Sequence, residues 1–91
     1  MELKDTIEMM QSADYKERFK AEYQQTKIRY EKLKAFVNRI EAAELTKDMR
    51  CQPKAPEHDC PSYLLRDQQE TMDRYLQILE IRAVIEGIDL A

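Results

Sequence analysis

The stretch "FKAEYQQTKIRYEKLKAFVNRI", residues 19–40, decides the fold. Its larger side chains recur at steps of 4, 3, 4, 3, 4 and 3 residues, the heptad spacing with which one helix packs along another. No proline or glycine interrupts residues 13–45, so the pattern predicts one long helix over that range, roughly 50 Å in length. The positions of this seam are Phe19, Tyr23, Thr26, Tyr30, Leu33, Val37 and Ile40.

The segment before the long helix predicts a shorter one. Leu3, Ile7 and Met10 follow the i, i+4, i+7 spacing of a single apolar helix face, which indicates a helix over about residues 3–11. Ser12 is the expected N-cap of the long helix, and Asp14 suits the positive end of that helix.

A third helix is predicted over residues 62–86. Ser62 can cap its start directly after Pro61, and Gly87, the only glycine, suits the left-handed residue that closes many helices. All three prolines fall in the connector, residues 46–61. The fold class is therefore all-α: a short N-terminal helix plus an antiparallel two-helix hairpin, forming a single helical domain over residues 1–91.

The last third of the third helix is apolar on several faces, which is more than one neighbouring helix covers. Large exposed apolar patches mark interfaces. We therefore expect a homo-oligomer that assembles into a helical bundle. The expected interface residues are Tyr75, Leu76, Ile78, Leu79, Ile81, Val84, Ile85 and Ile88.

Composition narrows the function classes. The N-terminus has no basic region typical of a signal peptide, and no run approaches the roughly 20 apolar residues that span a bilayer, so a cytoplasmic protein without membrane contact is expected. One histidine and one glycine leave no glycine-rich phosphate loop and no nucleophile elbow. We expect no catalytic residues, no enzyme activity and no cofactor.

The connector offers one metal alternative. Cys51, His58 and Cys60 are three ligand types that tetrahedral zinc accepts, although their spacing matches no strong zinc signature. A disulfide is a further alternative, disfavoured in a reducing compartment. A plain turn between two helices, shaped by the prolines, is the preferred interpretation, so no metal is predicted.

Charge is distributed unevenly along the chain. Residues 15–39 carry eight basic and three acidic side chains, a surplus of five positive charges, whereas the other 66 residues carry a net −8 because the whole chain is −3. Tyrosines and lysines alternate along one face of this basic segment. Tyrosine rings stack on bases, and Lys or Arg neutralises phosphate. The predicted ligand-binding residues are Lys20, Tyr23, Lys27, Arg29, Tyr30, Lys34 and Arg82.

Two interpretations of this Tyr–Lys face stay open. Across an oligomer axis it would form a symmetric anionic-ligand pocket matching a cyclic di- or trinucleotide. Alternatively, Tyr23 and Tyr30 belong to the packed seam and the lysines form its solvated flank. The expected partners of those lysines are Asp67, Glu70, Asp73 and Glu80. Arg82 either pairs with Glu86 four residues on, or faces a ligand or partner. The overall acidity argues against binding of duplex nucleic acid.

Three stretches carry a family resemblance: "DYKERFKAEYQQTKIRYEKLKAF" (14–36), "CP" (60–61) and "LLRDQQETMDRYLQILEIRAVIEGIDL" (64–90). They resemble a family of small helical proteins from phages and prophages of gut bacteria, labelled as related to a crAss-like phage protein. The resemblance implies an accessory viral protein acting inside an infected bacterial host. The layout is also similar to that of anti-CBASS and anti-Thoeris sponges, short helical hairpins that sequester cyclic-nucleotide immune signals.

The expected function is that of a phage anti-defence binding protein, a sponge holding a cyclic-nucleotide immune signal in an oligomer interface. A protein–protein inhibitor of a host defence complex, similar to anti-CRISPR proteins, is the first alternative. A small structural or regulatory phage subunit is the second.

Overall fold

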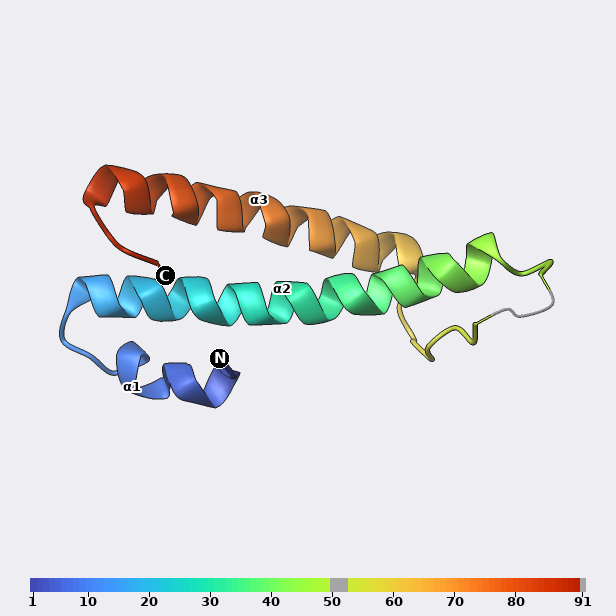
Figure 1. The fold of residues 1–91 in the computed structure, drawn as a ribbon, viewed down its shortest axis with the longest axis horizontal. Helices are drawn as coiled ribbons and strands as arrows, with labels where there is room; N and C mark the ends of the chain where they lie inside the picture. The colour runs from blue at the N-terminus through green and yellow to red at the C-terminus, as the bar shows by residue number, and fades with distance from the viewer. Residues whose placement is uncertain (50–52, 91) are drawn as a thin grey trace.

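A computed structural model describes residues 1–49 and 53–90 of the chain. Four helical elements follow one another: η1 (Leu3–Thr6), α1 (Ile7–Met10), α2 (Tyr15–Leu45) and α3 (Ser62–Glu86). The described residues contain no strand, which confirms the all-α class. The molecule is elongated, 54 × 25 × 22 Å, with α2 running along its length (Figure 1).

The hairpin of α2 and α3 holds the main core. The two helices run antiparallel, side by side over most of α3 (Figure 1). The predicted heptad seam is confirmed: five of its seven side chains are buried, and Tyr30 and Leu33 are half-buried. The buried seam side chains bury apolar area against α3, and that burial is the main force joining the hairpin. The α3 side chains that face the seam are Leu76, Leu79 and Ala83.

The start of α2 corrects one prediction. Asp14, not Ser12, is the N-cap residue, and its side chain accepts a hydrogen bond from the Lys16 backbone N–H at 3.0 Å. The Ser12 Oγ instead accepts a hydrogen bond from the Asp14 backbone N–H at 3.0 Å, in the turn before α2 begins. Both residue types cap helices, and the chain direction between α1 and α2 decided which one is used.

The two ends of α3 differ in how well the sequence predicted them. The helix spans the predicted residues, but Pro61 is the N-cap residue and Ser62 already lies inside the helix, so the Ser62 cap was wrong. Gly87 closes the helix with φ of 69°, as predicted. Ile88 then turns back into the core, with its N–H donating to the Ala83 carbonyl at 2.8 Å.

The N-terminal segment lies on the side of α2 that faces away from α3 (Figure 1). The predicted helix over 3–11 is instead a 3₁₀ turn followed by a single α-helical turn. Thr6 is fully buried there; its hydroxyl donates to the Leu3 carbonyl at 2.6 Å and accepts from Gln25 at 2.9 Å. Ala21 of α2 is also fully buried. The long helix is thus covered on two faces.

Candidate functional site

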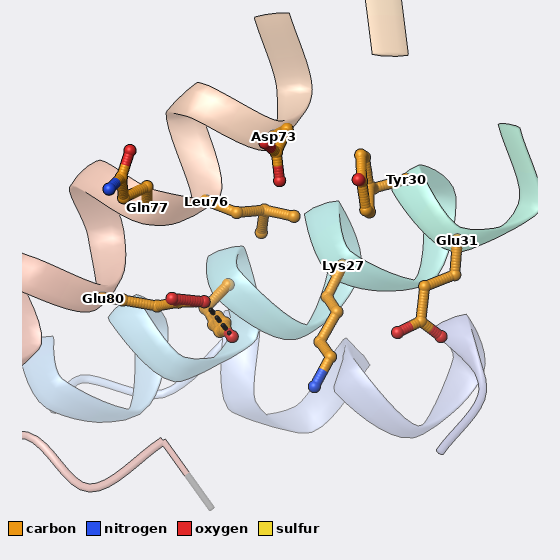
Figure 2. Close-up of a pocket in the computed structure, with 8 residues that line it drawn as sticks. Lys27, Tyr30, Glu31, Asp73, Leu76, Gln77 and Glu80 are labelled. Atoms are coloured by element: carbon orange, nitrogen blue, oxygen red, sulfur yellow. Dashed lines mark hydrogen bonds between the residues drawn. The ribbon is translucent and has the colours of Figure 1, made fainter. Parts of the chain in front are cut away.

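A groove of about 420 Å³ lies along one edge of the α2/α3 interface (Figure 2). Helix α2 supplies one wall and α3 the other, and Leu76 forms the apolar floor where the two meet. We call these residues the groove throughout: Tyr23, Lys27, Tyr30, Glu31, Asp73, Leu76, Gln77 and Glu80.

Tyr23 joins the groove to the core. Its ring is buried beside Leu76 and Leu79, while its hydroxyl donates to Glu80 Oε1 at 2.9 Å. Burial, the hydrogen bond to Glu80 and the negative charges of Glu80 and Glu31 raise the pKa of Tyr23 to about 12. Tyr23 therefore stays protonated at neutral pH and holds the Glu80 carboxylate at the edge of the groove.

Two lysines of α2 lie over tyrosine rings. Lys27 Nζ is 5.9 Å from the centroid of the Tyr23 ring, and Lys34 Nζ is 5.9 Å from the centroid of Tyr30. Both distances suit cation–π attraction, worth about 0.5–1 kcal/mol at exposed sites. Among the described residues, no ion pair joins either lysine to a carboxylate of α3. Lys27 thus keeps its ammonium available to the groove.

The lining of the groove is acidic overall, with one carboxylate from α2 and two from α3. Lys27 is the single cation among its lining residues, against the three carboxylates of Glu31, Asp73 and Glu80. Carboxylates accept hydrogen bonds and the ammonium donates them. The arrangement therefore suits a ligand with three features: an anionic group near Lys27, several N–H donors near the carboxylates, and a flat ring against Tyr30.

The remaining predicted ligand residues lie outside this groove. Lys20 is half-buried one turn before the groove, and Lys34 follows it. Arg29 is exposed and lies two residues from Lys27, about 200° away around the helix. Arg82 lies on the other edge of the α2/α3 interface, so the structure brings together only three of the seven predicted residues: Tyr23, Lys27 and Tyr30.

Arg82 belongs to a second cluster, which we call the closed edge. Its guanidinium lies 5.0 Å from the centroid of the Phe19 ring, donates to Tyr15 Oη at 2.9 Å and pairs with Glu86 at 3.3 Å. Tyr15 in turn donates to Glu86 Oε1 at 2.9 Å. The guanidinium of Arg82 is therefore hydrogen-bonded and paired with groups of its own chain.

Tyr75 extends the closed edge along α3. Its hydroxyl donates to Glu22 at 2.8 Å. That hydrogen bond, together with partial burial, raises the pKa of Tyr75. The closed edge therefore consists of side chains that satisfy one another: Tyr15, Phe19, Glu22, Tyr75, Arg82 and Glu86.

The acidic wall is what sequence reasoning missed as a binding surface. Asp73, Gln77 and Glu80 follow one another at steps of 4 and 3 residues, so they share one face of α3. The spacing of these polar residues was enough to identify a polar face of α3, but the sequence analysis treats Asp73 and Glu80 only as partners for lysines.

The predicted oligomer interface divides into two groups. Leu76, Leu79 and Ile88 are buried in the chain's own core, where they contact side chains of the same chain. The other five stay exposed on the surface of α3, with exposed fractions from 40% to 83%: Tyr75, Ile78, Ile81, Val84 and Ile85.

The connector gives no support to the zinc alternative within its described part. Cys51 lies outside the described residues. His58 packs edge-on against the Phe36 ring, and its Nδ1 lies 2.6 Å from the Cys60 carbonyl oxygen. No cluster of three or more His, Cys, Asp or Glu side chains suited to a metal occurs among residues 1–49 and 53–90.

In the described part of the chain, neither long helix has an apolar stretch of the length needed to cross a membrane. A sequence model of the Sequestin family matches residues 13–85, which include α2, all of α3 except its last residue, and the whole groove. No curated protein matches the chain. No solved structure matches it either.

Proposed function

The chain belongs to the Sequestin family, and we propose that it is a phage anti-defence protein that sequesters a cyclic-nucleotide immune signal in the bacterial cytoplasm. The family name describes a protein that sequesters, that is, a binding protein. Sequestration needs no chemistry: the protein lowers the free concentration of the signal in proportion to its own amount and affinity.

The observation that supports a nucleotide is the mixed chemistry of the groove. A phosphate suits the ammonium of Lys27, and a base suits the face of Tyr30. The amino and imino N–H groups of that base suit Glu31, Asp73 and Glu80, because carboxylates accept hydrogen bonds from base edges. A simple anion such as inorganic phosphate fits poorly, since three carboxylates face it.

The size of the groove supports the same class of ligand. Pockets for small molecules and cofactors usually have volumes of about 300–1,000 Å³, and this groove measures about 420 Å³. The groove is contained in one chain, yet Gln77 forms its outer rim on α3. We propose that a second subunit of a homo-oligomer borders the ligand at this rim.

Thermal unfolding with a panel of nucleotides tests the proposal. The panel contains cyclic di- and trinucleotides, cyclic ADP-ribose isomers and, for comparison, the linear forms of each. One cyclic member at 100 times its dissociation constant should stabilise the fold by about 2.7 kcal/mol and raise the melting temperature by several degrees. A flat response to every member would contradict sequestration of a nucleotide.

Matched variants place the ligand in the groove. Lys27→Ala and Tyr30→Ala should abolish or strongly weaken the melting shift. Lys32→Ala and Tyr63→Ala, which change the same side chains at exposed positions outside the groove, should keep it. An equal loss in all four variants would place the ligand elsewhere.

A second candidate function draws on the exposed apolar residues of α3. An inhibitor of a host defence protein would dock through Ile81, Val84 and Ile85, whose exposed fractions are 50%, 83% and 78%. This candidate predicts no response to any nucleotide. It predicts instead that one host protein co-purifies with the wild-type chain and is lost with Val84→Glu.

A further inference from the structure

The chain after α3 folds back onto α2 (Figure 1). Gly87 ends the helix with φ of 69°, the only positive φ among the described residues. Ile88 is 7% exposed within the core, and the Leu90 carbonyl accepts a hydrogen bond from Gln24 Nε2 at 2.9 Å. We call residues 87–90 the strap. A buried side chain and a hydrogen bond hold the strap on α2, beyond a glycine.

The strap crosses α2 on the groove side of the helix. Just before the strap begins, Glu86 accepts a hydrogen bond from Tyr15 at 2.9 Å. At the other end of the strap Leu90 meets Gln24, so the strap spans about two and a half turns of α2. With 3.6 residues per turn, Gln24 lies about 60° around α2 from Lys27. The strap therefore lies over the surface that continues the groove toward the N-terminus of α2.

One lysine on this face of α2 is less exposed than its neighbours. Lys16, Lys20, Lys27 and Lys34 follow one another at steps of 4, 7 and 7 residues, so they share the face. Lys20 is half-buried, and the other three are exposed. Lys20 precedes Gln24 by one turn and lies within the length that the strap spans. The position of the strap thus accounts for the burial of Lys20.

The part of the α2/α3 interface under the strap differs in charge from the groove. On α3, the groove face continues past Glu80 to Val84 and Gly87, at steps of 4 and 3 residues, and neither of these two brings a carboxylate. On α2, Lys20 and Gln24 bring an ammonium and an amide, which both donate hydrogen bonds. The groove has one cation against three carboxylates, whereas these two helix faces bring donors and no carboxylate to the covered part.

We propose that Lys20 and Gln24 form a phosphate-binding position beneath the strap, and that a ligand with two phosphate groups displaces the strap to reach it. The inference rests on the proposed function and deepens it, because it separates the phosphates from the base. Gln24 lies between Lys20 and Lys27, which are about 10.5 Å apart along the helix axis. Two phosphates at Gln24 are within reach of both ammonium groups, while the base lies in the acidic groove against Tyr30.

The strap has the properties of a cover that an anion displaces. It carries the carboxylate of Asp89, so it brings negative charge to a basic face of α2. Opening of the strap also frees the Gln24 amide from the Leu90 carbonyl. Segments outside helices open more readily than the helices that they follow. Because only open chains bind, the cover lowers the apparent affinity in proportion to the fraction of chains that are open.

Acetylation of lysine side chains, followed by mass spectrometry, tests the cover without any ligand. Ile88→Ser removes the buried anchor of the strap, and Lys20 should then react several times faster, at the rate of exposed Lys16. Ile7→Ser, at a position 52% exposed in α1, is the matched control and should leave the rate of Lys20 unchanged. Equal reactivity of Lys20 and Lys16 in the wild type would overturn the cover.

Calorimetric titration with inorganic pyrophosphate tests the phosphate position. Ile88→Ser should bind pyrophosphate about tenfold more tightly than wild type, the gain expected when about one wild-type chain in ten is open. Lys20→Ala added to Ile88→Ser should abolish the gain. Lys32→Ala added to Ile88→Ser, at an exposed position outside the groove, should keep it. Equal affinity in wild type and Ile88→Ser, or no binding in either, would overturn the proposal.

A milder variant protects the test against loss of folding. Leu90→Ser alters a half-buried side chain, and it should raise both the reactivity of Lys20 and the affinity for pyrophosphate, by less than Ile88→Ser does. If circular dichroism shows Ile88→Ser to be unfolded, no change in either measurement with Leu90→Ser would contradict the proposal.

The outcomes separate this proposal from sequestration of a nucleotide. A flat response to the nucleotide panel, with the gain in pyrophosphate affinity present, would contradict sequestration and leave the phosphate position intact. A nucleotide-induced melting shift that survives Lys20→Ala in full would keep sequestration and overturn the phosphate position.

Discussion

The two edges of the α2/α3 interface share residue types but differ in how their charges are matched. On the closed edge, Arg82 contacts Phe19, Tyr15 and Glu86. In the groove, Lys27 faces three carboxylates and pairs with none of them in the described chain. A charge whose partners lie within the fold stabilises the fold, whereas charges left facing a hollow are available to a ligand.

A tyrosine–glutamate hydrogen bond occurs on both edges, so this contact alone does not distinguish them. Tyr23 donates to Glu80 in the groove, and Tyr75 donates to Glu22 on the closed edge, at 2.9 and 2.8 Å. What differs is the neighbouring cation. Arg82 has a forked guanidinium that reaches two partners at once, while the single ammonium of Lys27 lies over a ring.

The largest expected effect comes from the core that lies between the two edges. Leu79 is 2% exposed in the centre of the core, so Leu79→Ala should lower the free energy of unfolding by about 2–5 kcal/mol. Urea denaturation measures the loss. Leu45→Ala, at a position 79% exposed, is the control and should change stability by less than about 0.5 kcal/mol. Equal losses would contradict the assigned core.

The closed edge should matter for stability and not for binding. Arg82→Ala removes a cation–π contact, a hydrogen bond to Tyr15 and an exposed ion pair, and we expect a loss of about 1–2 kcal/mol. The nucleotide-induced melting shift should survive. Arg39→Ala, also an exposed arginine, serves as the control with a loss below about 0.5 kcal/mol. Loss of ligand binding in Arg82→Ala would break the contrast between the two edges.

Alkaline pH should report on the groove edge through Tyr23. Its pKa is raised from 10 to about 12 in the fold, so the neutral form is favoured there. The stability it provides is fully present below pH 10 and is lost as pH rises through 12. Tyr23→Phe should cost about 1 kcal/mol at pH 7.

The pH profile separates this effect from general alkaline unfolding. Lysine deprotonation affects wild type and Tyr23→Phe alike, so their difference isolates the tyrosine. The variant should lose less stability than wild type between pH 10 and 12, measured by urea denaturation at each pH. Parallel profiles would mean that the hydroxyl of Tyr23 is not held by Glu80.

The smallest effect on stability should come from Lys27, the residue that we propose contacts the anionic group of the ligand. Lys27 is exposed and makes one weak contact to the Tyr23 ring, so Lys27→Ala should change the free energy of unfolding by less than about 1 kcal/mol. The same variant should lose the nucleotide-induced shift. A loss of stability as large as that of Arg82→Ala would show that Lys27 is a structural residue like its counterpart on the closed edge.

The chain pattern predicted the helices well because their signals are local. The 4, 3 spacing from Phe19 to Ile40 identified the face of α2 that is buried. The absence of proline and glycine from residues 13–45 predicted the length of the helix. Gly87 marked the end of α3 because glycine enters the left-handed region without strain. The predicted N-caps Ser12 and Ser62 were wrong, because serine and aspartate are both suitable cap residues and the local chain direction decides which position is used.

The candidate site was predicted in part, and the missing part is on the second helix. The Tyr–Lys face of α2 was identified because aromatic and basic residues share one helical spacing. One of the two interpretations of the Tyr–Lys face paired the lysines with Asp73 and Glu80, and no such ion pair occurs among residues 1–49 and 53–90. Whether opposite charges meet or leave a groove depends on the separation of the helices at that level, which no local pattern encodes.

The sequence by itself determined that the chain forms long helices, that α2 presents a seam, and that α3 carries more apolar surface than one helix can cover. These properties follow from spacing of a few residues. Tertiary structure alone decided which apolar residues of α3 enter the core and which stay outside, and on which edge each charge lies. The physical reason is that burial depends on the rotation of α3 about its axis relative to α2. That rotation places Leu79 inside, Ile85 outside, and Lys27 and Arg82 on opposite edges.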